Sequence, residues 1–283
     1  MFHIKDEILN DLEVNPWKRL RNRLIIFVLS PYRLLKALLL VTGALVWGFA
    51  LILSIATFTM LEELPHFTQD DFKPIQKDAQ TSVNLRLKDA QKKHTWVTID
   101  NISRELLYAI IMSEDGKFFS HQGIDYDALI NALGENIKRR EWSLGASTIS
   151  QQTVKNIYLT QNKTLYRKLQ EIITTRRLEK ALSKNQILEL YLNVVEFGPD
   201  IYGLADAADY YFNTQPHKLN AAQGAFLALL MPSPRKYHYT IYQNKHLSKR
   251  HLKKYKRILR DMRYKDYISP KQHSEYLSWN FFQ

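Results

Sequence analysis

Acidic, amide and cationic side chains are concentrated in three stretches of this sequence, and each stretch has residue types that could act on a polar substrate. The first stretch begins with Glu114 and Asp115, which end an apolar segment with helical spacing. A loop containing Phe118, His121 and two glycines follows them. A carboxylate placed beside aromatic side chains suits general acid or base catalysis. On its own, however, an acidic pair at a helix end is more commonly a solvated surface feature.

The second stretch has the features of a helix that binds an anion and a sugar. Ser147 and Thr148 follow small residues and are typical of a helix N-terminus, where free backbone N–H groups favour an anion. Gln151 and Lys155 follow Ser147 at intervals of four, and Gln152 precedes Lys155 by three, so a helix places them on one side. This row of polar groups fits a hydroxyl-rich sugar and a phosphate, although a hydrated helix face has the same pattern.

The third stretch places two cations beside one carboxylate. Arg167 and Glu171 are four residues apart, and Lys168 and Glu171 are three apart, so all three lie on one face of a helix. An exposed ion pair of this kind contributes only tenths of a kcal/mol. The functional interpretation is a carboxylate held ionised by cations that also receive a pyrophosphate. The fragment alone favours the simple ion pair.

The elements that must position these residues are predicted to be helices. Ser103 is a plausible N-cap for a helix that reaches Glu114. Strand signals are few and short, and residues 62–89 are predicted to be a linker before a mostly α domain over 90–283. In the segment 184–194, Glu189 and Asn193 are expected to form a structural hydrogen-bonding pair. Further helices are predicted near residues 127–140, 147–159, 164–182, 184–194, 204–212, 218–231 and 246–263.

Residues 37–61 form an uncharged, apolar run of 25 residues. A helix of this length reaches about 37 Å, enough to cross a hydrocarbon core of about 30 Å. Basic residues precede the run and Glu62 and Glu63 follow it, so the positive-inside rule places residues 1–36 in the cytoplasm and the following domain outside. The sequence therefore predicts a single-pass protein of the cytoplasmic (inner) membrane with a periplasmic or otherwise extracytoplasmic domain.

The charge of the chain is concentrated near its C-terminal end. The formal net charge is +12, and residues 235–283 contain 13 Lys/Arg and 3 Asp/Glu. Such clustering suggests a polyanionic neighbour, and outside the membrane lipid phosphates are a better candidate than nucleic acid. The chain has no cysteine, which excludes disulfides, thiolate metal sites and a cysteine nucleophile.

Taken in order, these stretches resemble the glycosyltransferase domain of the peptidoglycan glycosyltransferases (family 51), and most closely its monofunctional biosynthetic transglycosylases. The resemblance covers roughly residues 90 to 240. Small departures are Ala146 for a glycine and Thr175 for an alanine, and Lys163 stands where the family often has arginine. Lysine keeps the charge but loses bidentate phosphate contacts. The five matching motifs begin at Glu114, Gly145, Arg167, Lys184 and Met231.

The resemblance implies a lysozyme-like α-helical domain with a small membrane-facing lobe. Glu114 would be the general base that activates the GlcNAc 4-hydroxyl of incoming lipid II, which attacks MurNAc C1 of the growing chain with inversion and releases undecaprenyl diphosphate. Glu171, the second catalytic candidate, would orient the cations, hold a metal or stabilise charge at C1. The implied substrate-binding residues are Asp115, Phe118, His121, Ser147, Thr148, Gln151, Gln152, Lys155, Asn156, Lys163, Arg167 and Lys168.

The resemblance implies no required cofactor, although a divalent cation (Mg or Mn) is compatible with it. The implied partners are lipid II, the undecaprenyl-diphosphate-linked glycan chain, membrane lipid and other cell-wall synthases, with no nucleic acid. Three other functions are weaker. A lytic enzyme of lysozyme type has no use for a pyrophosphate-binding cluster, an inactive scaffold does not need the intact polar motifs, and a transpeptidase domain does not fit in the fewer than 50 residues after Met231 to Arg235.

Overall fold

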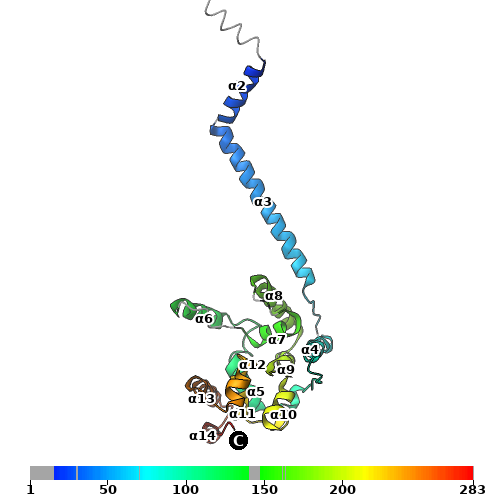
Figure 1. The fold of residues 1–283 in the computed structure, drawn as a ribbon, viewed down its shortest axis with the longest axis vertical. Coiled ribbons are helices and arrows are strands. Elements are labelled where there is room, and N and C mark those ends of the chain that lie inside the picture. Colours follow the sequence, from blue (N-terminus) through cyan, green and yellow to red (C-terminus); the bar gives the residue numbers. More distant parts are fainter. Residues whose placement is uncertain are drawn as a thin grey trace, which may run out of the picture. The chain divides into compact units, whose positions relative to one another are not determined.

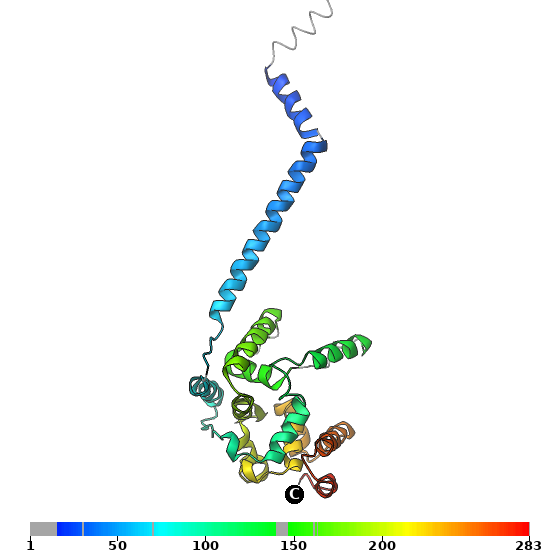
Figure 2. The same cartoon turned by 180° about the vertical axis from the view of Figure 1, so that it is seen from behind.

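The computed structural model of the chain describes residues 16–29, 31–69, 71–139, 147–160, 162 and 164–282. The chain divides into two compact units, Met1–Glu63 and Leu64–Gln283. Figures 1 and 2 show the long helix of the first unit and the helical domain of the second from opposite sides. The mostly α fold predicted from the sequence is confirmed.

The first unit consists of α2 (Pro16–Leu29) and α3 (Pro31–Glu63). Helix α3 contains the whole predicted span, residues 37–61. Within the part of the chain that the structure describes, it is the one helix long and apolar enough to cross a membrane. Its large apolar side chains, such as Leu38, Trp47 and Phe58, are exposed. These properties are consistent with a single membrane anchor.

The predicted helices of the second unit are present within a few residues of their expected ends. They are α5 (Arg104–Glu114), α6 (Tyr126–Arg139), α7 (Ile149–Tyr158), α8 (Leu165–Ala181), α9 (Lys184–Val194), α10 (Leu204–Phe212), α11 (Ala221–Leu230) and α13 (Lys249–Tyr264). The structure adds α4 (Phe72–Leu87), α12 (Pro234–Tyr237), α14 (Pro270–Leu277), the short helices η1 (Ile99–Asn101), η2 (Pro216–Lys218) and η3 (His238–Gln243), and a two-stranded antiparallel hairpin of β1 (Glu196–Gly198) and β2 (Ile201–Tyr202).

Helix α4 corrects the prediction of a linker over residues 62–89. Ile75, Ala79, Val83 and Leu87 are spaced four apart and are all buried, so α4 presents one apolar stripe to the domain. It packs against α7 and α9. Pro74 is tolerated because it lies in the first turn, where the missing N–H has no helical acceptor. Much of the predicted linker is therefore part of the folded domain.

Helix α11 forms the centre of the domain and packs closely against α5. Every residue of α11 except Gln223 is buried. A Cβ added to Gly224 would lie 2.9 Å from Ala109 Cβ and 3.0 Å from Leu106 Cα. These distances are shorter than normal carbon–carbon contacts, so the two helices approach as closely as they do because residue 224 has no side chain. This packing fixes α5, whose last residue is Glu114.

We expect Gly224→Ala to lower the free energy of unfolding by about 1–3 kcal/mol, because the new methyl group must push α5 and α11 apart. Thermal unfolding of the purified protein measures this change. The matched control is Gly134→Ala on α6, where an added Cβ meets nothing within 4 Å. Alanine in that open helical position should be neutral or slightly stabilising. Equal stability of the two variants would contradict the close packing of α5 and α11.

Helix α9 holds the chain segment that leads into α5. Asn193 is fully buried, accepts a hydrogen bond from Val97 N (2.9 Å) and donates to Val97 O (2.8 Å). The Glu189 carboxylate accepts from Trp96 Nε1 (3.0 Å) and Ile99 N (2.9 Å). Asn193 also donates to the Glu189 main-chain oxygen (2.8 Å). The structural role predicted for these two residues is confirmed, with backbone groups as their main partners.

Candidate active site

The Glu114 carboxylate lies at the end of α5 and faces two other helices. Its side chain is 14 % exposed. One oxygen, Oε1, accepts a hydrogen bond from Ser113 Oγ (3.0 Å) and lies 3.5 Å from Lys254 Nζ of α13. The other, Oε2, lies 3.5 Å from Gln152 Nε2 of α7. Tyr191 of α9 donates to Gln152 Oε1 (3.3 Å), which fixes the amide. The first and second predicted stretches therefore meet at this carboxylate.

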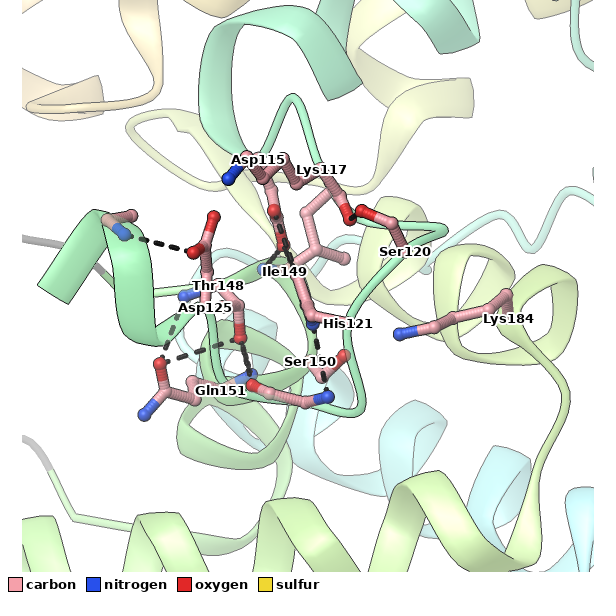
Figure 3. A network of polar contacts seen from close by, with 12 residues as sticks. Asp115, Lys117, Ser120, His121, Asp125, Thr148, Ile149, Ser150, Gln151 and Lys184 are labelled. Atoms are coloured by element: carbon pink, nitrogen blue, oxygen red, sulfur yellow. Dashed lines mark hydrogen bonds and ion pairs between the residues drawn. The ribbon is translucent and has the colours of Figure 1, made fainter.

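Asp115, the residue after Glu114, connects the same two stretches through buried hydrogen bonds (Figure 3). Its side chain accepts a hydrogen bond from Ile149 N (2.9 Å), at the start of α7. Both of its oxygens lie 3.0 Å from His121 Nε2. His121 Nδ1 in turn accepts from Gly123 N (3.1 Å). A carboxylate at a helix N-terminus is favourable because it satisfies an N–H that has no helical partner.

The N-terminus of α7 is also closed by its own side chains. Thr148 and Gln151 form a capping box, in which each side chain accepts a hydrogen bond from the other's backbone N–H. Thr148 Oγ1 also donates to Gly123 O (2.6 Å). Phe118 is completely buried, with Lys184 Nζ 4.6 Å from its ring centroid. The Ile149 and Gln151 N–H groups at the helix start are therefore already bound by protein side chains.

Five of the residues predicted to bind substrate are buried or nearly buried and join the loop after α5 to the start of α7: Asp115, Phe118, His121, Thr148 and Gln151. Their contact with substrate stays a prediction. Two other predicted residues of α7 face carboxylates: Gln152 contacts Glu114, and Lys155 interacts with Glu171. The polar side chains of α7, expected to share one role, therefore have two: Gln151 caps the helix, and Gln152 and Lys155 face the site.

We expect Asp115→Ala to lower the free energy of unfolding by about 1–3 kcal/mol, because it leaves the buried Ile149 N and the His121 ring without their acceptor. Catalytic activity should also fall in the fraction of protein that remains folded, because the start of α7 sets the position of Gln152. Thermal unfolding and catalytic turnover measured on the same preparation separate the two effects. Asp125→Ala is the control, since Asp125 caps only the neighbouring helix α6 through Ala128 N (2.9 Å). If both variants lose the same activity, the connection through Asp115 does not position the site.

The two cations of the third stretch do surround one carboxylate. Arg167 Nη1 donates to Glu171 Oε2 (2.8 Å), and Lys168 Nζ pairs with Glu171 Oε1. Lys168 Nζ also donates to Ser147 Oγ (3.3 Å), which joins α8 to the residue before the N-cap of α7. Glu171 is 2 % exposed. Burial of the Glu171 carboxylate carries a desolvation cost, which its two cationic partners offset.

Lys155 brings a third cation to this cluster. The side chain is half-buried on α7, one helical turn after Gln152. Burial lowers the pKa of the Lys155 ammonium; the Glu171 carboxylate opposes this shift, and the cations Arg167 and Lys168 add to it. Three cations and one carboxylate therefore share a region next to Glu114. Such a region favours a ligand with more than one negative charge.

Lys163 and Asn156 were also predicted to bind substrate. Lys163 lies outside the described residues. The main-chain oxygen of Asn156 faces α4, where it accepts a hydrogen bond from Ser82 Oγ (2.9 Å) and a contact from Arg86 Nη2. Arg86 also lies 5.6 Å from the Tyr202 ring centroid. Helix α4 therefore caps the C-terminal turn of the helix that carries Lys155.

Sequence reasoning missed Lys254, which was interpreted only as part of a basic tail. It reaches Glu114 from 140 positions further along the chain. One signal was available: Lys254 adjoins Tyr255, which belongs to the apolar side of α13 together with Leu259 and Met262. A lysine at the edge of such a buried stripe can be carried into the protein, whereas one on the opposite face cannot.

The residues around Glu171 do not have the composition of a divalent-cation site. Across residues 16–29, 31–69, 71–139, 147–160, 162 and 164–282, there is no group of three or more His, Asp or Glu side chains that could hold a metal ion. Each Glu171 oxygen already has a cationic partner. A metal ion bound there would have to displace or repel these cations, so the use of Mg or Mn remains a prediction without a ligand set.

Comparisons with known proteins point to one family. The transglycosylase family model matches residues 80–263. The biosynthetic peptidoglycan transglycosylase of Nitrosomonas eutropha is 44 % identical over 170 residues, covering 60 % of this chain and 68 % of that protein. The proteins of the same name from Chromobacterium violaceum and Methylobacillus flagellatus are 40 % and 42 % identical over 182 and 171 residues, covering 64 % and 60 % of this chain and 73 % and 72 % of theirs.

The matched region contains the carboxylate Glu114, the cations Lys155, Arg167 and Lys168, and the newly found Lys254. It also includes the second half of α4, so the family model extends into the segment that was predicted to be a linker. The match covers well over half of the chain. The chain therefore belongs to the transglycosylase family and is a peptidoglycan glycosyltransferase.

Proposed function

We propose that this enzyme polymerises lipid II into glycan strands by inverting transfer, with Glu114 as the general base and a cationic pocket as the site of the leaving diphosphate. The observation that carries the proposal is the position of Gln152, which contacts Glu114 and lies one helical turn from Lys155 on α7. An acidic group and a cationic cluster thus border the same stretch of one helix, as a base and a leaving-group site must.

In the proposed reaction Glu114 removes the proton from the GlcNAc 4-hydroxyl of incoming lipid II. The oxygen forms a bond to C1 of the MurNAc at the end of the growing chain, and the bond from C1 to the diphosphate oxygen breaks. Undecaprenyl diphosphate leaves as an anion and needs no proton. The chemistry therefore requires one base and several cations, which matches the groups present.

We assign the leaving diphosphate to Lys155, Arg167 and Lys168, together with Lys163. Arg167 Nε is buried and has no hydrogen-bond partner within the described residues. An anionic oxygen supplies such a partner. Glu171 would hold the two α8 cations in place rather than bind a metal, because each of its oxygens contacts one of them. On this account the enzyme does not require a divalent cation.

The membrane-facing lobe is assigned to α6 and the start of α8, which lie at the end of the domain opposite α10 and α14 (Figure 1). Ile130 and Ile137 of α6 are 67 % and 71 % exposed, and Leu165 of α8 is 87 % exposed. Apolar side chains exposed together suit contact with lipid. The donor cations also lie on α8, so lipid-linked diphosphate would reach them from this end.

We further propose that α3 spans the cytoplasmic membrane with its N-terminal end inside. The basic residues of 18–36 precede the span, and the catalytic domain would then lie on the outer side, where glycan strands are made. Contacts with other cell-wall synthases belong to the same proposal. Contact of the whole basic C-terminal region with lipid does not, because α14 lies at the end of the domain opposite α6 and the start of α8 (Figure 1).

The test is incubation of the detergent-solubilised full chain with lipid II, with the products separated by length on a gel. We expect a ladder of glycan strands and release of undecaprenyl diphosphate. Cleavage of preformed glycan without strand formation would favour a lytic enzyme. Binding of lipid II with neither outcome would indicate a scaffold, and either result would refute the proposed function.

A further inference from the structure

A lysine of the basic C-terminal region lies within the active site. Lys254, in the second turn of α13, places Nζ 3.5 Å from Glu114 Oε1. The side chain of Lys254 is 23 % exposed, whereas the neighbouring Lys253, Lys256 and Arg257 are exposed. One cation of α13 is thus separated from the others and directed at the carboxylate assigned as the base.

The protein holds this ammonium group in place from two sides. Lys254 Nζ donates to Ala228 O (2.9 Å), a carbonyl in the last turn of α11 that has no partner within its helix. A cation is favourable at such a helix C-terminus. The adjacent Tyr255 and the following Ile258 are buried, which fixes α13 against the domain. Lys254 therefore cannot move away from Glu114 without losing its hydrogen bond to α11.

The two oxygens of Glu114 consequently have different surroundings. Oε1 contacts Lys254 and accepts a hydrogen bond from Ser113. Oε2 faces Gln152 of α7, the helix that also carries Lys155. One oxygen is bound to protein cations and hydroxyls, and the other is directed toward the proposed leaving-group site.

We propose that Lys254 is a positioning residue for the general base: its ammonium holds Glu114 Oε1, so that Oε2 is left to accept the proton of the sugar hydroxyl. This inference rests on the proposed function of Glu114. Lys254 itself does not contact the reacting atoms in this role.

The other titratable groups around this pair do not supply the same effect. Asp115 of α5 is engaged by His121 and the backbone of α7. Burial raises the pKa of Tyr191 of α9 well above its usual value, with Glu114 and Asp115 adding to the shift, so Tyr191 stays neutral. Arg257 is exposed on α13. Burial lowers the pKa of Lys254, and Glu114 opposes this shift.

The test is the steady-state kinetics of polymerisation with lipid II, with kcat and KM measured separately. A base whose carboxylate is no longer held in position loses rate in the proton-transfer step while substrate binding is retained. We therefore expect Lys254→Met to lower kcat by about tenfold with little change in KM. Lys254→Arg keeps the charge and should restore most of kcat. The control is Lys253→Met, which removes an exposed charge from the same helix and should leave kcat unchanged.

The proposal is overturned if Lys254→Met leaves kcat unchanged, or if it raises KM with kcat intact. A loss of kcat that Lys254→Arg does not restore would indicate a purely structural contact with α11 and would also overturn the proposal. Should Lys254→Met not fold, Lys254→Gln is measured instead, because its amide can still donate to Ala228 O. Glu114→Gln separates this proposal from the proposed function: if that variant is active, the base assignment itself fails, whatever the result for Lys254.

Discussion

Glu114→Gln is expected to lower kcat for glycan polymerisation by about 10²–10⁴-fold, the usual contribution of a positioned general base. Glutamine keeps the size of the side chain and can still contact Ser113 and Gln152, but it cannot accept the proton of the attacking hydroxyl. The domain should remain folded, because the centre of the packing is α11 against α5 rather than the end of α5. Turnover of lipid II and circular dichroism of the same preparation measure both effects.

Glu105→Gln provides the comparison on the same helix. Glu105 lies in the first turn of α5 and accepts hydrogen bonds from Ala221 N (3.0 Å), Gln272 and Tyr276 Oη (2.7 Å). This carboxylate joins α5 to α11 and α14 and is remote from α7. Its replacement should lower the unfolding temperature while the folded enzyme turns over within a few-fold of wild type. Wild-type turnover by Glu114→Gln would contradict the assignment of the base.

The second large effect is expected for Lys155→Ala, with a loss of about 10²–10³-fold in kcat/KM, comparable to removal of one group that stabilises a developing anion. The reason is that Lys155 is half-buried, so its charge acts on the leaving diphosphate with little screening by water. Lys155→Arg should recover part of the loss, since it keeps the charge with a different geometry.

Lys180→Ala is the control for Lys155→Ala, because it removes an exposed cation from α8 outside the cluster. Steady-state kinetics with lipid II should show no comparable loss for this variant. If Lys155→Ala and Lys180→Ala have the same kinetics, then Lys155 does not contribute to the leaving-group site, and the diphosphate binds elsewhere.

The helices of the domain were predictable because their apolar residues repeat with helical spacing and their caps are visible. Ser103, Ser183 and Asn220 each stand one residue before a helix and accept a hydrogen bond from its third residue. Helix α4 was missed because Pro74 and many polar residues make its apolar helical spacing hard to recognise. Its buried residues are spaced by four, but each is separated by charged or amide side chains.

The site was predictable where one helix sets the geometry. Arg167, Lys168 and Glu171 meet as their spacing requires, because three- and four-residue intervals place side chains on one helical face. Thr148 and Gln151 were assigned to the substrate through the family resemblance, and Gln151 also through its spacing of four from Ser147 and Lys155. Their spacing also matches a capping box, and the structure has that arrangement, so a hydroxyl and an amide at a helix start are explained by the backbone.

The spacing of residues along one helix could not predict contacts between segments that are far apart in the sequence. Lys254 approaches Glu114 because α13 packs against α5, and nothing near residue 254 specifies that partner. Arg86 of α4 and Asn156 of α7 likewise meet through helix packing that no local pattern specifies. The contacts of such residues depend on tertiary packing. Apolar periodicity predicts which face of a helix is buried, but it does not predict which other helix packs against that face.

The most direct measurement is a structure of the Glu114→Gln chain with two molecules of lipid-linked disaccharide bound. The account predicts the acceptor 4-hydroxyl oxygen within about 2.6–3.2 Å of the residue 114 side chain. It also predicts the donor diphosphate in contact with Lys155 and the α8 cations. A diphosphate bound away from α7 and α8, with the sugar hydroxyl out of reach of residue 114, would contradict it.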